Sequence, residues 1–201
     1  MTSGLVVRKL KIEDSQAIAN LHFDSFKGFF LTSLGVSFLK IFYNAVLSNS
    51  KGLGVGIFYK GQLLGFAVGT SNKEGFYKTI FRSSGIDMFL KAFPKLITNP
   101  SKINRLVVTL MSSNKADYSA SPSLLSICVS GDTSFKGLGS KLIREFEKEL
   151  AQNKYSTVVL TTDKHNNDYV NQFYIRNQYL CIHSFSQGRR EMNFYYKKLE
   201  I

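Results

Sequence analysis

Cysteine is scarce in this sequence. Cys128 and Cys181 are the only two, 53 residues apart, and neither belongs to a Cys-x-x-Cys pair or a cluster with histidine. This pattern excludes the common structural zinc sites, and no metal is expected. We expect two buried thiols in a reducing compartment, although spacing alone leaves a disulfide between them open because it does not give geometry.

Long apolar runs are missing and acidic residues are few. No stretch reaches the roughly 18 apolar residues that a membrane span needs. The first eight residues lack the basic-then-apolar pattern of a signal peptide, so we expect a cytoplasmic protein. Fourteen Asp and Glu stand against 26 Lys and Arg, which leaves a formal net charge of +12. That excess indicates an anionic partner: nucleic acid, a phosphorylated cofactor or substrate, or an acidic membrane surface.

Apolar residues recur in the pattern of an α/β protein. With 201 residues, 44% of them hydrophobic, the chain can build its own core, and we interpret 1–201 as a single domain. The periodicity predicts strands over 5–12, 53–59, 63–69, 124–129, 157–162, 179–185 and 192–199, and helices over 15–26, 34–47, 137–152 and 167–177. These elements predict a mixed central sheet of about six or seven strands flanked by helices.

Residues 71–122 differ from the sequence on either side. All three prolines, Pro94, Pro100 and Pro122, lie here, and positions 71–115 hold eight basic against two acidic residues. Apolar stripes over 76–81 and 86–97 predict short amphipathic helices broken by the prolines. We interpret the segment as a helical, basic insertion between the third and fourth strands, because about 50 residues are marginal for an independent core.

A glycine-containing loop joins the strand over 124–129 to the helix that follows. It reads Ser-Gly-Asp-Thr-Ser-Phe-Lys-Gly-Leu-Gly-Ser over 130–140, so Gly137 and Gly139 fall where the helix begins and Lys136 lies beside them. At such a place, free N–H groups and the positive end of the helix dipole bind phosphate oxygens. A tight strand-to-helix turn is the alternative. The loop matches neither the P-loop nor the dinucleotide pattern GxGxxG, which would need glycine at Leu142.

Two motifs here resemble the signatures of the GNAT superfamily of acyl-CoA N-acyltransferases. The first signature, Q/R-x-x-G-x-G/A, corresponds to 134–139, with Ser134 in place of Gln or Arg. The second, N-x-x-A-x-x-F-Y-x-x-x-G-F, corresponds to 167–179, which keeps Asn167 and the pair Phe173-Tyr174 but has Val, Gln and Tyr where the family has Ala, Gly and Phe. The order of the predicted elements agrees with the family along the whole chain.

This resemblance implies a GNAT fold and an N-acetyltransferase that moves an acetyl group from acetyl-CoA to the primary amine of a small-molecule acceptor, by direct attack in a ternary complex. The fourth and fifth strands are then expected to part around the pantetheine arm. The main chain at Ile127 and Val129 would pair with that arm, and an N–H there would stabilise the oxyanion. The loop residues implied in binding the phosphates are Ser134, Phe135, Lys136, Gly137, Leu138, Gly139 and Ser140.

Tyr174 matches the general acid of the family, which protonates the departing thiolate. A thiol pKa near 8.5 against a phenol pKa near 10 makes that transfer feasible without a large shift. Asn167 is implied to bond the pantetheine. The structural alternatives are an aromatic ring packed beside Phe173 and a simple helix N-cap.

No motif assigns the general base. Asp163, at the end of the strand over 157–162, is the first candidate, with a cap for the next helix as its alternative. His22 and Asp24 fall on the first helix, near where the acceptor is expected, while His165 and His183 have no evident partners. The strings over 29–35 and 160–163 look like those of bacterial GNAT proteins of sugar-nucleotide and polysaccharide synthesis, which would make an amino-sugar nucleotide the acceptor.

Two other readings compete with the enzyme. A basic, aromatic-rich chain can act as a nucleic-acid-binding module, but no motif supports one and no specific nucleic acid is expected. Residues 76–97 can instead form a basic amphipathic surface that contacts an anionic membrane, with an ordinary solvated helix face as the alternative. A homodimer is a further option.

Overall fold

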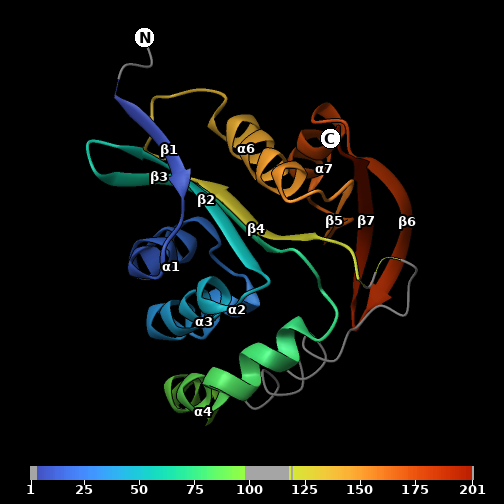
Figure 1. Ribbon diagram of the computed structural model, residues 1–201. Coiled ribbons are helices and arrows are strands. Elements are labelled where there is room, and N and C mark those ends of the chain that lie inside the picture. The colour runs from blue at the N-terminus through green and yellow to red at the C-terminus, as the bar shows by residue number, and fades with distance from the viewer. Residues whose placement is uncertain (1–3, 98–117, 119, 201) are drawn as a thin grey trace.

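One seven-stranded mixed sheet organises the molecule (Figure 1). The computed structural model describes residues 4–97, 118 and 120–200. The strands are β1 (Leu5–Lys9), β2 (Gly52–Tyr59), β3 (Gln62–Thr70), β4 (Ser123–Val129), β5 (Thr157–Asp163), β6 (Leu180–Gln187) and β7 (Arg190–Lys198), and they lie in the order β1-β2-β3-β4-β5-β7-β6. All neighbours are antiparallel except β4 and β5. The predicted α/β class and mixed sheet are confirmed.

Helices cover both faces of this sheet (Figure 1). One face carries α1 (Ser15–Ser25), preceded by the 3-10 turn η1 (Ile12–Asp14), and then α2 (Phe30–Ser33), α3 (Val36–Ser48) and α4 (Phe76–Ile97); the other carries α6 (Leu138–Gln152) and α7 (Asp168–Arg176). Each face has its own hydrophobic core, because the apolar stripes of its helices pack against alternate residues of the strands.

Helix α4 is the inserted element between β3 and β4, and it differs from the prediction in one respect. It is one continuous helix of 22 residues, with Pro94 inside its last turns, so the prediction of separate helices broken there is wrong up to Ile97. Phe76, Ile80 and Met88 are at most 1% exposed and lie on one stripe. This packing outweighs the single hydrogen bond that proline removes. Pro100 and the rest of 98–117 lie outside the described residues.

The two cysteines are free thiols on β4 and β6, which answers the question that spacing left open. Cys128 is partly buried and Cys181 is exposed, so the expectation of two buried thiols is wrong for Cys181 and met only in part for Cys128. The exposure follows from topology, because β6 is the last strand of the sheet. No helix within the described part of the chain is both long and apolar enough to cross a membrane.

Candidate active site

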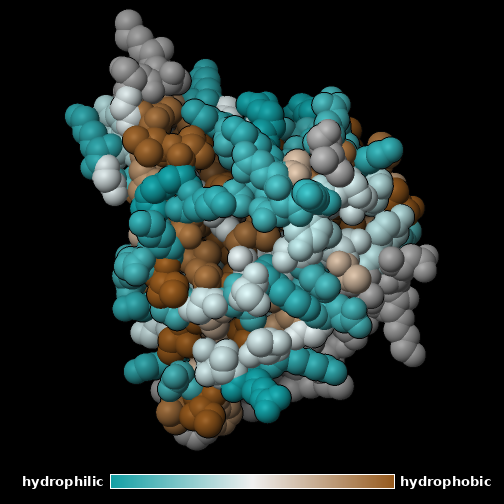
Figure 2. Space-filling model, viewed as in Figure 1, coloured by the Kyte–Doolittle hydropathy of each residue, from teal (hydrophilic) through white to brown (hydrophobic). Residues whose placement is uncertain are grey.

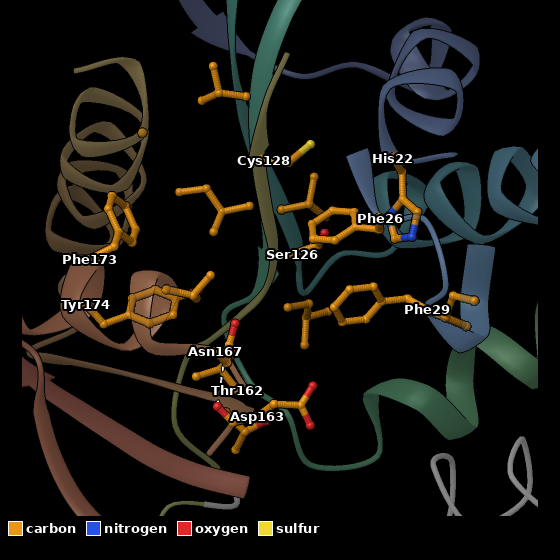
Figure 3. Close-up of a pocket in the computed structure, with 18 of the residues that line it drawn as sticks. His22, Phe26, Phe29, Ser126, Cys128, Thr162, Asp163, Asn167, Phe173 and Tyr174 are labelled. Carbon is orange, nitrogen blue, oxygen red and sulfur yellow. Dashed lines mark hydrogen bonds between the residues drawn. The ribbon is translucent and has the colours of Figure 1, made fainter. Parts of the chain in front are cut away.

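A cavity of about 800 Å³ lies where β4 and β5 part. Figure 3 shows its two sides: Phe173 and Tyr174 lie on one side of β4, and His22, Phe26 and Phe29 on the other. The volume falls in the range of pockets that hold cofactors and small ligands. A site between two strands of one sheet is open to both layers of helices, so two ligands can meet in it from opposite faces.

The parting of β4 from β5 leaves main-chain groups on β4 exposed to the cavity. The two strands share a single register pair, Ser123 with Val159, whereas β5 pairs with β7 along its whole length. At the far end of β4 the N–H of Ser130 donates to the carbonyl oxygen of Leu64, at 2.7 Å. Because the backbone alternates along an antiparallel strand, the N–H and C=O of Ile127 and Val129, both cavity-lining, point away from β3 and into the gap.

The loop over 130–140 ends in a sharp turn at the start of α6. Gly137 is the N-cap residue with φ +74°, a left-handed conformation that suits glycine. The N–H groups of Lys136 and Gly137 donate no hydrogen bond to any described residue, and the first N–H groups of α6 have no partner within the helix. These donors, the helix dipole and the Lys136 ammonium make the turn suited to phosphate oxygens.

The remaining loop residues divide into two groups. Phe135, Lys136, Leu138 and Gly139 line the cavity together with Gly137, whereas Ser134 and Ser140 are not among its lining residues. Gly139 has a packing role, because a Cβ there would lie 3.2 Å from Cε2 of Phe173. The close approach of α6 to α7 therefore depends on this glycine.

Tyr174 projects from α7 into the cavity (Figure 3). Its side chain is 6% exposed, and its ring lies 5.3–5.7 Å from those of Phe173, Tyr179 and Tyr195. The hydroxyl has no hydrogen-bond partner among the described residues. Burial, and then the neighbouring Tyr195, raise the pKa of the Tyr174 phenol. A phenol in this position stays protonated at neutral pH, and its raised pKa also makes it a weaker acid toward a thiolate than the unshifted phenol expected from the sequence.

Asn167 ties the start of α7 to the end of β5. Its Nδ2 donates to Oγ1 of Thr162 at 2.8 Å and to the carbonyl oxygen of Asp163 at 3.0 Å (Figure 3). Although Asn167 occupies the N-cap position of α7, its side chain makes no capping hydrogen bond. The amide oxygen, which these contacts leave unused, is the atom that remains for a ligand in the cavity.

Asp163 lines the cavity but is held in an ion pair. Arg190 donates from Nε to Oδ1 at 2.6 Å and from Nη2 to Oδ2. The two charge-assisted hydrogen bonds occupy a lone pair on each carboxylate oxygen. Nothing in the sequence around Arg190, at the start of β7, signalled this partner, because only the sheet brings the two residues together.

A polar chain crosses the opposite side of the cavity. Nδ1 of His22 lies 2.6 Å from the Tyr43 hydroxyl, which donates to Oγ of Ser126 at 3.3 Å. His22 is 5% exposed, its Nε2 has no hydrogen-bond partner among the residues that the structure describes, and burial lowers its pKa to about 4. The imidazole is therefore neutral. Sequence patterns did not indicate Tyr43 and Ser126, since an aromatic residue on a helical stripe and a serine in a strand are commonplace.

The other acidic and histidine candidates lie away from the cavity. Asp24 is exposed on α1 and does not line it. His165 pairs with Glu191 at 2.8 Å, and the His183 ring stacks on Phe194 at 5.0 Å, so both have partners that the sequence did not suggest. No group of three His, Cys, Asp or Glu side chains suited to a metal ion occurs among the described residues.

Comparison with known sequences finds no family model and no curated protein that matches the chain. Solved structures match over nearly all of it. The N-acetyltransferase from Staphylococcus aureus Mu50 has a TM-score of 0.62 at 15% identity over 98% of this chain and 100% of that one. A GNAT-family acetyltransferase from Bacillus cereus ATCC 10987 has 0.60 at 12% over 98% and 99%. The ribosomal-protein-S18-alanine N-acetyltransferase from Escherichia coli has 0.58 at 13% over 98% and 95%. The chain therefore has the GNAT acetyltransferase fold, as predicted.

Proposed function

We propose that this protein is an N-acetyltransferase that moves an acetyl group from acetyl-CoA to the primary amine of a small molecule. The observation that supports this most directly is that one cavity combines three features: the edge of β4 that faces away from β3, the N–H groups at the start of α6, and the hydroxyl of Tyr174. In the described part of the chain these N–H groups and this hydroxyl have no hydrogen-bond partner. The fold shared with known acetyltransferases supports the same reading. Residues 1–201 form one catalytic domain in this proposal.

The residues on the α6 and α7 side fit coenzyme A. The N–H groups of Lys136 and Gly137 and the first turn of α6 are donors for the pyrophosphate, and Lys136 adds a positive charge. The exposed edge at Ile127 and Val129 can pair with the amides of an extended pantetheine arm as a neighbouring strand would. Acetyl-CoA then supplies the acetyl thioester.

Tyr174 is the proposed general acid. When the amine nitrogen forms its bond to the acetyl carbon and the C–S bond breaks, the phenol gives its proton to the departing thiolate sulfur, and the amine releases one proton to a base. Direct attack fits this cavity, since the only cysteine that lines it, Cys128, has its pKa raised to about 12 by burial and is a poor nucleophile. Asn167 holds the donor through its amide oxygen.

Asp163 stays the first candidate for the base, acting directly or through water. The two hydrogen bonds from Arg190 position the Asp163 carboxylate at the end of β5. They must loosen before the carboxylate can accept a proton. Asp163→Asn should then lower kcat with little change in the KM for acetyl-CoA. An unchanged kcat would assign the role of base to another group.

Membrane contact through 76–97 is a second proposal, which one observation favours. Ile86 and Leu90 on α4 are 79% and 60% exposed, beside the exposed side chains of Arg82 and Lys91. Figure 2 shows apolar side chains at the lower end of the molecule, where α4 lies in Figure 1. An apolar patch with basic neighbours suits an anionic bilayer. Co-sedimentation should rise with acidic lipid in the vesicles, and equal binding to neutral vesicles would refute this contact.

The test of the enzymatic proposal is release of coenzyme A thiol from acetyl-CoA, followed with a thiol reagent, over a panel of amino acids, peptides, polyamines and amino-sugar nucleotides. Acetyl-CoA should also raise the melting temperature. If millimolar acetyl-CoA leaves the melting temperature unchanged, the assignment fails. A steep salt dependence of DNA binding without such a shift would instead favour the nucleic-acid-binding module. The amino-sugar nucleotide suggested by the sequence is one acceptor in this panel.

A further inference from the structure

Half of the cavity is a chamber walled by aromatic rings on the α1, α3 and α4 side of β4. In Figure 3, Phe26 and Phe29 face it across β4 from Tyr174. We call this half the aromatic chamber, and its rings include those of Phe26, Phe29, Phe42, Tyr43, Tyr77 and Phe81. Rings on several walls favour a ligand with an apolar or aromatic body, because each ring contributes contact area and edge or face interactions.

None of the charged residues described along the cavity comes from the elements that wall the aromatic chamber. Among the described lining residues, only Lys136, Asp163 and Arg190 carry charge at neutral pH, and they come from the loop before α6, β5 and β7. Asp163 and Arg190 neutralise each other in their ion pair. The described lining residues therefore offer a polyanion such as a nucleotide, or a polycation, no counter-charge in the aromatic chamber, and an unpaired charge is costly in a site removed from water.

A chain of polar groups interrupts the aromatic chamber and ends at Ser126, beside β4. Ser126 lines the cavity next to Ile127 and receives the hydrogen bond of Tyr43, which in turn contacts His22. Tyr43 is fully buried, so this chain holds Ser126 from behind. The Ser126 oxygen is thus a fixed hydrogen-bond acceptor at the point where the aromatic chamber meets the free edge of β4.

The inserted helix α4 completes the aromatic chamber. Tyr77 and Phe81 reach the cavity from its first turns, while Phe76 and Ile80 are buried in the core that it shares with α3. The segment that composition alone left without a role in the reaction therefore supplies one wall of the site. Its packing fixes the positions of the two cavity rings.

We infer that the acceptor is a primary amine carried on a small apolar body, best an aromatic ring, with its nitrogen at Ser126 and its body in the aromatic chamber. This inference rests on the proposed acetyl transfer and names the substrate class of that site. It favours an arylalkylamine over an amino-sugar nucleotide or a polyamine.

The experiment compares kcat/KM for phenylethylamine, spermidine and a nucleotide-linked amino sugar at saturating acetyl-CoA, with thiol release as the readout. Phenylethylamine should lead by about tenfold or more, since each ring contact adds to binding. A second arm replaces acetyl-CoA by octanoyl-CoA. The longer donor should be poorer, because its chain would occupy the space of the amine body. Preference for octanoyl-CoA would mean that the aromatic chamber holds the acyl group, and would overturn the inference.

A matched pair of variants ties the preference to the aromatic chamber. Phe26, the C-cap residue of α1, lines it, with its ring 4.6 Å from that of His22 and 5.5 Å from that of Phe29. Phe23 on α1 is 37% exposed and outside the cavity. Phe26→Ala should raise the KM for phenylethylamine by about tenfold, and Phe23→Ala should leave it unchanged. The melting shift with acetyl-CoA should be equal in both.

Binding gives a readout that does not depend on turnover. Calorimetric titration of phenylethylamine into protein saturated with coenzyme A should detect binding to wild type and Phe23→Ala, and much weaker binding to Phe26→Ala. If acetyl-CoA shifts the melting temperature but spermidine or the sugar nucleotide is the better acceptor, the substrate class is wrong and the acetyltransferase stands. If acetyl-CoA gives no shift, the proposed function itself fails.

Discussion

The turn at Gly137 offers the sharpest test of donor binding. Gly137→Glu places a carboxylate at the N-terminus of α6, beside the N–H groups assigned to the pyrophosphate. A Cβ at Gly137 would meet nothing within 4 Å, so the variant introduces no clash. Two separate effects remain: backbone strain, because φ is +74°, and repulsion between the carboxylate and the phosphates.

The two effects have different sizes. The left-handed conformation costs a non-glycine residue roughly 1–2 kcal/mol, which lowers the melting temperature of the free protein by a few degrees. Two unit charges about 4 Å apart repel by about 1 kcal/mol in water and about 4 kcal/mol at the effective dielectric near a protein surface. Taking about 3 kcal/mol, affinity for acetyl-CoA falls more than 100-fold.

Differential scanning fluorimetry separates the effects. At a ligand concentration about 100 times Kd, acetyl-CoA adds about 2.7 kcal/mol, which for a domain of this size is roughly 5–10 °C. At the same concentration, Gly137→Glu should retain less than about 2 °C of that gain. The controls are Gly137→Asn, which tolerates this backbone without adding charge, and Gly131→Glu, which adds the charge at an open position of the loop away from α6. A full shift in Gly137→Glu would refute the assignment of this turn to the phosphates.

Three further predictions concern the acid, the buried histidine and a buried ion pair. Tyr174→Phe should lower kcat about 100-fold with little change in the KM for acetyl-CoA; equal loss in both would indicate a packing role. Burial lowers the pKa of His22 from 6.5 to about 4. The contribution of the neutral imidazole to the free energy of unfolding is therefore complete above pH 6.5, and the free energy of unfolding falls by about 3 kcal/mol as the pH drops to 4. Urea denaturation at several pH values should show that His22→Gln lacks this loss of stability toward pH 4. The same loss in the variant would contradict the prediction. Lys197→Met removes the cation that lies 2.7 Å from Glu147, whose side chain is 10% exposed. The free energy of unfolding, measured by urea denaturation, should fall by about 3–5 kcal/mol. A change below about 1 kcal/mol would mean that the pair is solvated.

Local patterns were sufficient to predict most of the fold. Alternating and helical periodicities depend on neighbours in sequence, so the strands around 53–69 and the helices at α3 and α6 could be placed to within a residue or two. The continuous helix through Pro94 was missed because its stability comes from long-range packing of one face against α3, which local chain signals do not contain.

The sequence by itself determined the loop that ends at Gly137 and the Asn167 and Tyr174 pattern, since each depends on residues close together in the chain. Only the tertiary structure decided what surrounds them. The tertiary structure pairs Asp163 with Arg190 and connects His22 to Ser126 through Tyr43. It also places the inserted helix α4 along one side of the cavity. These contacts join residues 21 to 83 positions apart. The side chains that meet across such distances are set by the register of the strands and the packing of the helices, and by no pattern in the sequence itself.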